Sequence, residues 1–311
     1  MTPASTVLSL RAESASATIL EFLHTPHTGR VIATFARSCY LALDRRIVAL
    51  VSAELHNGPL NVVVTPAPPF GDLSTGAPAS SNGHRIQVID VWDTSLDGAT
   101  AWDPILRRID HTARGVPDNH LQVLTDLIAA EAPAGGLARL SVDRAGGVLT
   151  PLERTASLGL RNLLTGLGRA NRAQVVLGAH ALAGLGPGLT PSGDDVLVGC
   201  LLALAALPDA RGASLREAIA SSARHRTTQI STAYLEAAAR GEASEAWHRL
   251  IAAMGTSDAV RVVGAARHVL AVGETSGSDM LGGFILASRA VLDVPAPTAA
   301  VRHSMGMSHA Q

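Results

Sequence analysis

The chain has 311 residues, of which 47% are hydrophobic, and its formal net charge at neutral pH is −1. This length and apolar content allow a large core and favour two domains. Charged residues make up only 16% of the chain, so the charge pattern indicates neither a nucleic acid nor an anionic membrane as partner. All 25 basic residues are arginine, and this excludes Schiff-base chemistry, a pyridoxal phosphate anchor and a P-loop lysine.

The N-terminal part of the chain, residues 1–118, is predicted to be a mainly β domain. Short runs rich in β-branched residues are separated by turns, and they fall at residues 31–35, 47–51, 61–64 and 85–89. The segment 65–83 is rich in proline, glycine and serine. Such a composition predicts a loop lying over the sheet.

The rest of the chain has long stretches of alanine and leucine at helical spacing, which predict a compact α-helical domain over residues 119–298. The predicted helices span residues 119–131, 151–167, 173–183, 195–207, 215–240, 243–254, 259–272 and 279–292. Residues 132–149 are either a linker or contain a strand that returns to the sheet. Residues 299–311 are expected to form a disordered tail. The predicted fold class is therefore α+β.

The chain shows no signal for a membrane or for export. The apolar run at residues 196–207 ends at Pro208, well short of the roughly 20 residues that a membrane span needs. No basic segment followed by a long apolar core begins the chain, so no signal peptide is expected. Cys39 and Cys200 are too few for a disulfide framework, and a cytoplasmic location is expected.

One short phrase, S-G-x-D-x-L-x-G, occurs twice, beginning at Ser192 and again 84 residues later at Ser276. Each copy opens a strongly apolar stretch. A small polar turn that leads into a helix exposes free N–H groups at the positive end of the helix dipole, where an anion is stabilised. We therefore expect the two turns to converge on one pocket that handles phosphate.

The residue types around the two turns suggest individual roles. Glycines permit positive φ and close approach of a ligand, and hydroxyls and amides donate hydrogen bonds. The residues expected to bind phosphate or substrate are Gly186, Gly188, Thr190, Gly193, Ser276 and Gly277. Asp195 aligns with Asp279, and these two with Ser192 are the candidate catalytic residues. Asp194, Asp195 and Asp279 are candidate ligands of Mg²⁺. The alternative interpretation is that the carboxylates only cap the two helices.

A third segment lies between the turns. Thr228, Ser231 and Tyr234 or Leu235 are spaced three or four residues apart, so they can project from one helix face. Thr228 and Ser231 are expected to contact the substrate. Arg226, or alternatively Arg224, is expected to clamp a substrate carboxylate or carbamoyl group with its planar guanidinium. The alternative is an ordinary solvated helix face that begins with a threonine cap.

Two known phosphate-binding patterns resemble the glycine-rich turn. In Gly184-x-Gly186-x-Gly188 the third glycine comes one residue early for a dinucleotide-binding fingerprint. Kinases of the ribokinase type combine a glycine-rich turn with an aspartate at a helix start. The order of a β region followed by a helical region argues against that fold, although a ribokinase-like phosphoryl-transfer enzyme stays an alternative.

Residues 184–195 as a whole resemble the AllH family. The resemblance is supported by Thr228, Ser231, Tyr234 and Leu235 and by residues 275–281. It implies a subunit of a multi-subunit oxamate carbamoyltransferase of allantoin breakdown, which interconverts oxalurate plus phosphate with oxamate plus carbamoyl phosphate. The implied ligands are carbamoyl phosphate, phosphate or a small carboxylate. The implied partners are other subunits of a hetero-oligomer, or further copies in a homo-oligomer. The resemblance assigns no catalytic residue to this subunit, so a non-catalytic assembly subunit is the alternative.

Overall fold

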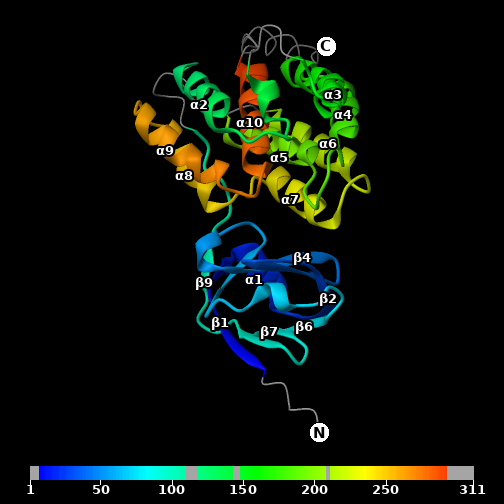
Figure 1. The fold of residues 1–311 in the computed structure, drawn as a ribbon, viewed down its shortest axis with the longest axis vertical. Helices are drawn as coiled ribbons and strands as arrows, with labels where there is room; N and C mark the ends of the chain where they lie inside the picture. The colour runs from blue at the N-terminus through cyan, green and yellow to red at the C-terminus, as the bar shows by residue number, and fades with distance from the viewer. Residues whose placement is uncertain (1–6, 110–117, 143–147, 208–210, 293–311) are drawn as a thin grey trace, which may run out of the picture.

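The computed structural model describes residues 7–109, 118–142, 148–207 and 211–292. Strands come first and most helices follow, as Figure 1 shows with the strand-rich half in blue and cyan and the helical half from green to red. The predicted α+β class is confirmed. The predicted domain limits stay a prediction, and the proposed tail at residues 299–311 lies outside the described residues.

The strand-rich half is a single sheet. Its strands are β1 (Leu8–Ser16), β2 (Pro26–Phe35), β3 (Ser38–Leu43), β4 (Arg46–Ser52), β5 (Asn61–Thr65), β6 (Pro78–Asn82), β7 (Arg85–Val88), β8 (Trp92–Ser95) and β9 (Thr100–Trp102). The sheet follows the order β5-β4-β3-β2-β6-β7-β8-β1, and β1 pairs back to β5, so these strands close into a barrel. Strand β9 lies beside the end of β1. Closure pairs both edges of the sheet.

The helices are α1 (Ala17–Leu23) in the strand-rich half and then α2 (Asp118–Glu131), α3 (Pro151–Gly168), α4 (Arg172–Leu182), α5 (Ser192–Ala206), α6 (Gly212–Ala223), α7 (Gln229–Arg240), α8 (Glu245–Met254), α9 (Ala259–Leu270) and α10 (Ser276–Leu292). Short 3₁₀ helices are η1 (Ala53–Leu55), η2 (Phe70–Asp72) and η3 (Ala138–Ser141). Among the described helices, none is long and apolar enough to cross a membrane.

Strand β4 explains how the barrel joins the helices. Side chains alternate between the two faces of a strand. Val48 and Leu50 point into the barrel core, whereas Ala49 and Val51 belong to a second apolar cluster against which Ala233 of α7 packs. The uninterrupted apolar run is therefore a strand buried on both faces.

The first difference from the sequence prediction falls in residues 65–83. This segment contains η2 and strand β6, although only a loop was predicted. The residues of β6, PASSN, include no β-branched side chain. The strand exists because β2 and β7 pair with it on its two sides, and strand formation depends strongly on such context.

The second difference is a break within the predicted helix at residues 215–240. Helix α6 ends at Ala223 and α7 begins at Gln229. Between them, Arg224 is extended with ψ 135° and His225 has a left-handed φ of 67°. Thr228 then caps α7 by accepting a 3.0 Å hydrogen bond from the Ser231 amide. The cap residue thus marks a new helix start, as the threonine-cap alternative allows.

The third difference concerns residues 132–149. The helix η3 occupies the place where a returning strand was one of the two options. Asp279 holds its start, because one carboxylate oxygen accepts hydrogen bonds from the Leu137 and Ala138 amides. This part of the chain therefore packs against α10, while residues 143–147 lie outside the described range.

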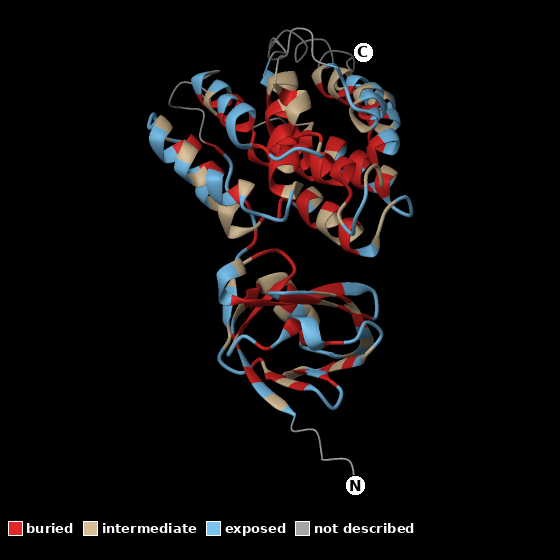
Figure 2. Cartoon of the chain, viewed as in Figure 1, coloured by how far each residue is buried: buried red, intermediate tan, exposed pale blue. Residues whose placement is uncertain are grey.

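The core of the helical half is the crossing of α5 and α10. Every residue of α5 is buried, which Figure 2 shows as a red helix in the centre of this half. A Cβ added to Gly199 would lie 1.8 Å from the Met280 carbonyl oxygen, and one added to Gly283 would lie 2.1 Å from the Val196 carbonyl oxygen. Both glycines are the last residue of the repeated phrase. Each copy thus lets the other helix approach to backbone contact.

The repeat extends to the hairpins α4–α5 and α9–α10. The Gly193 amide donates to the Leu185 carbonyl at 2.8 Å, and the Gly277 amide donates to the Val272 carbonyl at 2.9 Å. In both copies a Cβ at this second position of the phrase would lie 2.1 Å or 2.0 Å from a carbonyl oxygen at the end of the preceding helix. The repeated phrase therefore marks the same kind of helical hairpin in two places in the chain.

We expect Gly199→Ala to destabilise the protein by roughly 3 kcal/mol, because the added methyl group meets backbone that has no room to move. Gly264→Ala is the matched control, since Gly264 lies inside α9 with nothing within 4 Å of an added Cβ. That change should stabilise by about 0.5–1 kcal/mol through helix propensity. Urea unfolding measures both. Equal effects of the two substitutions would contradict the close crossing.

Candidate functional site

The structure brings the two copies of the phrase together at one end of the crossing. Helices α5 and α10 both begin at the first serine of the phrase. The hydroxyls of Thr190, in the turn before α5, and Ser276 are 3.1 Å apart. We call residues 184–195 and 275–279 together the twin-turn site. The expected convergence of the two turns is therefore observed.

The glycine-rich turn runs over the surface of this site. Gly184, Gly186 and Gly188 all have positive φ, a conformation that glycine adopts without strain. Pro187, Gly188 and Leu189 are exposed. Among the described residues, the amides of Gly186 and Gly188 donate to no other group. The turn therefore presents backbone donors to solvent.

Side chains at the start of helix α7 hold this turn by hydrogen bonds. The Thr228 hydroxyl donates to the Leu189 carbonyl at 2.6 Å, and the Ser231 hydroxyl reaches the same oxygen at 3.4 Å. The predicted substrate-contacting pair is thus near the twin-turn site, with its hydroxyls engaged by the turn. Arg226 lies at the surface, where its Nε donates to the His180 carbonyl at 3.2 Å.

Asp194 anchors the beginning of the turn. One of its carboxylate oxygens accepts a 2.9 Å hydrogen bond from the Gly184 amide, and the other accepts a hydrogen bond from the Thr227 hydroxyl. Burial nevertheless raises the pKa of Asp194, although these two donors act against the shift. Both oxygens serve the local fold, so Asp194 fits the capping interpretation.

Asp279 is fully buried, with 0% of its surface exposed. Its Oδ1 accepts hydrogen bonds from the Leu137 amide at 2.6 Å and from the Ala138 amide at 2.7 Å. Its Oδ2 is buried without a hydrogen-bond partner. Burial raises the pKa of Asp279, while the Ser192 hydroxyl and the two amides lower it. The Oδ1 of Asp279 therefore has a structural role, whereas Oδ2 has no hydrogen-bond partner.

Asp195 is only 5% exposed, and its Oδ2 is also buried without a hydrogen-bond partner. Burial raises the pKa of Asp195 to about 8. The Ser276 hydroxyl lowers this pKa, and the negative charges of Asp279 and Asp194 raise it. Burial and the neighbouring negative charges therefore favour the protonated form of Asp195.

The two aspartates form a reciprocal arrangement. The serine of the second copy faces Asp195, and the serine of the first copy, Ser192, faces Asp279. Two backbone N–H groups stabilise the charge of Asp279 by hydrogen bonds. No backbone N–H donates a hydrogen bond to the Asp195 side chain among the described residues. The two amides favour the charged form of Asp279 more than any donor favours that of Asp195, so a proton shared by the pair is favoured on Asp195.

Other observations limit what the helix starts can bind. The amides of Gly193, Asp194 and Asp195 donate to the carbonyls of Leu185 and Pro191, so these first-turn donors are already used. Within the described residues, no group of three or more His, Cys, Asp or Glu side chains is arranged to hold a metal ion. The predicted Mg²⁺ site at Asp194, Asp195 and Asp279 stays a prediction.

Sequence reasoning missed one part of this site, and it gave Tyr234 no individual role. The amides of Leu137 and Ala138 come from a segment with no motif, so no sequence signal could have paired them with Asp279. Tyr234 is close enough for Asp195 to raise its pKa further above the effect of burial, and its hydroxyl is 3.0 Å from that of Tyr40 on the barrel. Tyr234 follows Ser231 at helical spacing, and this spacing already grouped it with Thr228 and Ser231.

Comparison with known families supports the resemblance. Residues 182–288 match the AllH family model, which is described as oxamate carbamoyltransferase subunit AllH. The match covers α5 to α9, most of α10 and both copies of the repeated phrase. No solved structure matches the chain. The AllH resemblance inferred from the sequence is thereby confirmed over this segment.

The raised pKa of Asp195 predicts how stability depends on pH. In an unfolded chain an aspartate has a pKa of about 3.9, whereas the folded value is about 8. Between these values the folded chain keeps a proton that the unfolded chain has lost, so the free energy of unfolding falls as pH rises. The fall is at most about 1.4 kcal/mol per pH unit. Asp195→Asn should remove this component, which urea unfolding at a series of pH values measures.

Asp126→Asn provides the control for this experiment, because Asp126 is exposed on α2 and accepts a hydrogen bond from Gln122. The free energy of unfolding of the Asp126→Asn variant should depend on pH in the same way as that of the wild type. The assignment of a proton to Asp195 fails when Asp195→Asn and the wild type lose stability in parallel from about pH 5 to about pH 8.

Proposed function

We propose that this chain, whose residues 182–288 match the AllH family, is a subunit of an oxamate carbamoyltransferase. The reaction interconverts oxalurate plus phosphate with oxamate plus carbamoyl phosphate. The protein acts in the cytoplasm together with other subunits or further copies of itself. The observation that carries the proposal is the buried pair of Asp195 and Asp279, each with an unpartnered carboxyl oxygen.

The chemistry of this pair suits a carbamoyl group. A carbamoyl group presents a carbonyl oxygen, which accepts hydrogen bonds, and an NH₂, which donates them. A protonated Asp195 donates to the carbonyl oxygen, and an ionised Asp279 accepts from the NH₂. Hydrogen bonds of this kind are strong in a site shielded from water. The pair would thus orient the group that is transferred between oxamate and phosphate.

The phosphate would lie on the glycine-rich turn. Gly186 and Gly188 have free amides in the described structure and positive φ, and free backbone N–H groups of a glycine-rich turn can donate hydrogen bonds to a phosphate. The Thr190 hydroxyl is 3.1 Å from that of Ser276, and the Ser276 and Ser192 hydroxyls lower the pKa of Asp195 and Asp279. Because the aspartates are buried, the proposal requires the exposed residues 187–189 to admit the substrate.

Isothermal titration of the purified chain tests the proposal, with carbamoyl phosphate, oxamate and phosphate as ligands, each with and without Mg²⁺. We expect carbamoyl phosphate and oxamate to bind, and the Asp195→Asn plus Asp279→Asn variant to bind them at least tenfold more weakly, a loss of about 1.4 kcal/mol or more. The amide that replaces the protonated carboxyl keeps its size, so packing is preserved.

Asp126→Asn, on the surface of α2, should leave these affinities unchanged. Circular dichroism of the double variant would check that it still folds. Equal affinities in the wild type and the double variant would remove the aspartate pair from the binding site.

A non-catalytic assembly subunit is the second candidate. The observation in its favour is that Asp194, the first-turn amides of α5, and the hydroxyls of Thr228 and Ser231 all serve internal hydrogen bonds. Under this alternative the twin-turn site only holds the helical half together. Titrations without heat in both the wild type and the double variant would favour it.

A further inference from the structure

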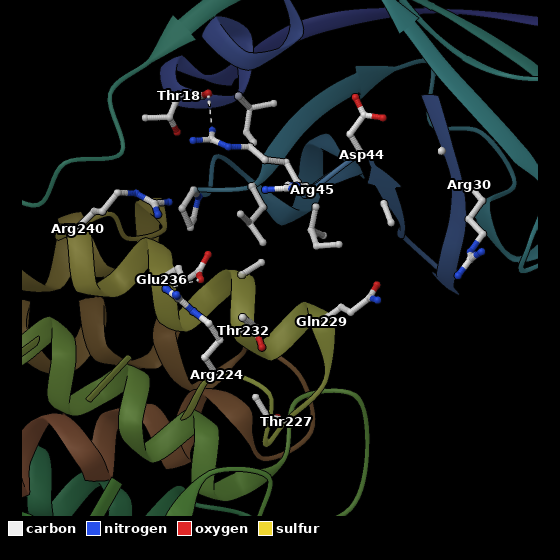
Figure 3. A pocket seen from close by; sticks show the side chains of 18 of the residues that line it. Thr18, Arg30, Asp44, Arg45, Arg224, Thr227, Gln229, Thr232, Glu236 and Arg240 are labelled. Atoms are coloured by element: carbon white, nitrogen blue, oxygen red, sulfur yellow. Dashed lines mark hydrogen bonds and ion pairs between the residues drawn. The ribbon is translucent and has the colours of Figure 1, made fainter. Parts of the chain in front are cut away.

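A large cavity lies between the barrel and α7, away from the aspartate pair. Its volume is about 1010 Å³. Figure 3 shows side chains from the barrel on one side and from α7 and the segment before it on the other. From α7 the cavity is lined by Gln229, Thr232, Ala233, Glu236 and Arg240, which repeat at helical spacing and so form one face of the helix.

The cavity is strongly basic for a protein with a net charge near zero. Five arginines line it, against two carboxylates, Asp44 and Glu236. Both carboxylates have cationic or histidine partners: Glu236 is 3.2 Å from Arg224, and Asp44 is 2.6 Å from His27. Neither carboxylate therefore neutralises the remaining arginines on the barrel side.

Three of the five arginines are engaged by the protein. Arg240 makes two hydrogen bonds to Glu242 at 2.8 Å and 3.0 Å. Arg46 donates to the Thr18 carbonyl at 3.0 Å and lies over the Phe22 ring, and Arg224 pairs with Glu236. Their guanidinium groups help to shape the walls of the cavity.

The other two, Arg30 and Arg45, are exposed, and their guanidinium groups make no hydrogen bond or ion pair with any described residue. Arg30 is in β2 and Arg45 is in the turn between β3 and β4, and the paired strands β2 and β3 bring them to the same end of the barrel. Gly29, beside Arg30, makes this pairing close, because a Cβ there would lie 1.8 Å from the Ala42 carbonyl oxygen. Figure 3 shows both arginines on the barrel side of the cavity.

From these contacts we propose that the cavity between the barrel and α7 is a binding site for a small molecule with two or more phosphate or carboxylate groups. Arg30 and Arg45 supply the free guanidinium forks, which match both kinds of anion with paired hydrogen bonds. Ile19, Ile47 and Leu60 line the same cavity and offer an apolar surface to an uncharged part of the ligand. The volume is at the upper end for small-molecule sites.

Isothermal titration of the full chain with inorganic pyrophosphate and, separately, with citrate tests this proposal and distinguishes phosphate from carboxylate as the preferred anion. We expect at least one of the two to bind, and Arg30→Ala plus Arg45→Ala to weaken that binding at least tenfold. Added NaCl should weaken it in the wild type, because charge attraction drives it.

Arg11→Ala is the matched control, since Arg11 is also an exposed arginine of the barrel without a partner among the described residues, and it does not line the cavity. The Arg11→Ala variant should bind pyrophosphate or citrate with the same affinity as the wild type. The proposal is overturned when neither anion binds the wild type, or when the Arg30 and Arg45 double variant binds as tightly as the control.

The aspartate variant separates this site from the proposed carbamoyl site. Asp195→Asn plus Asp279→Asn should keep the affinity for pyrophosphate or citrate. Loss of that affinity in the aspartate variant, with retention in the arginine variant, would assign the anion to the twin-turn site and overturn the cavity proposal. Failure of the carbamoyl proposal leaves this outcome unaffected, because the two experiments use different ligands and different residues.

Discussion

The backbone contact between α5 and α10 is the constraint on which the rest of the structure depends. Glycine at positions 199 and 283 lets each helix touch the carbonyl groups of the other, and such close packing fixes the angle and register of both helices. Because each helix begins with the same phrase, the contact also brings their first turns together. The location of the twin-turn site therefore follows from two absent side chains in the middle of the helices.

This packing imposes an electrostatic cost on the same helices. It buries Asp195 and Asp279 next to each other, where removal from water outweighs the hydroxyls that favour their charged forms. A protein selected only for stability would place apolar residues of similar volume here, which often stabilise relative to buried charged groups. The two acids, and the free oxygen on each, are thus the part of the crossing that packing alone does not explain.

Much of this fold could be predicted from local patterns, because helical spacing and β-branched runs are encoded over a few residues. The convergence of the two turns could also be expected, because the repeated phrase implies equivalent units. Strand β6 and the break before α7 depend on pairing partners and on threonine hydrogen bonds that come from distant parts of the chain. The Leu137 and Ala138 amides that hold Asp279 carry no side-chain signal at all. Closure of the barrel by β1 and β5 is likewise a long-range property.

Helix α7 gives the architecture a thermodynamic consequence. Its start is bonded to the glycine-rich turn through Thr228, Tyr234 on the same helix is bonded to Tyr40 of the barrel, and Thr227 both lines the cavity and donates to Asp194. A ligand that draws this helix toward the barrel would change the free energy of positioning the turn. By linkage, a ligand on the turn would then alter affinity in the cavity by the same factor. Helix α7 is thus the element that connects the cavity to the glycine-rich turn.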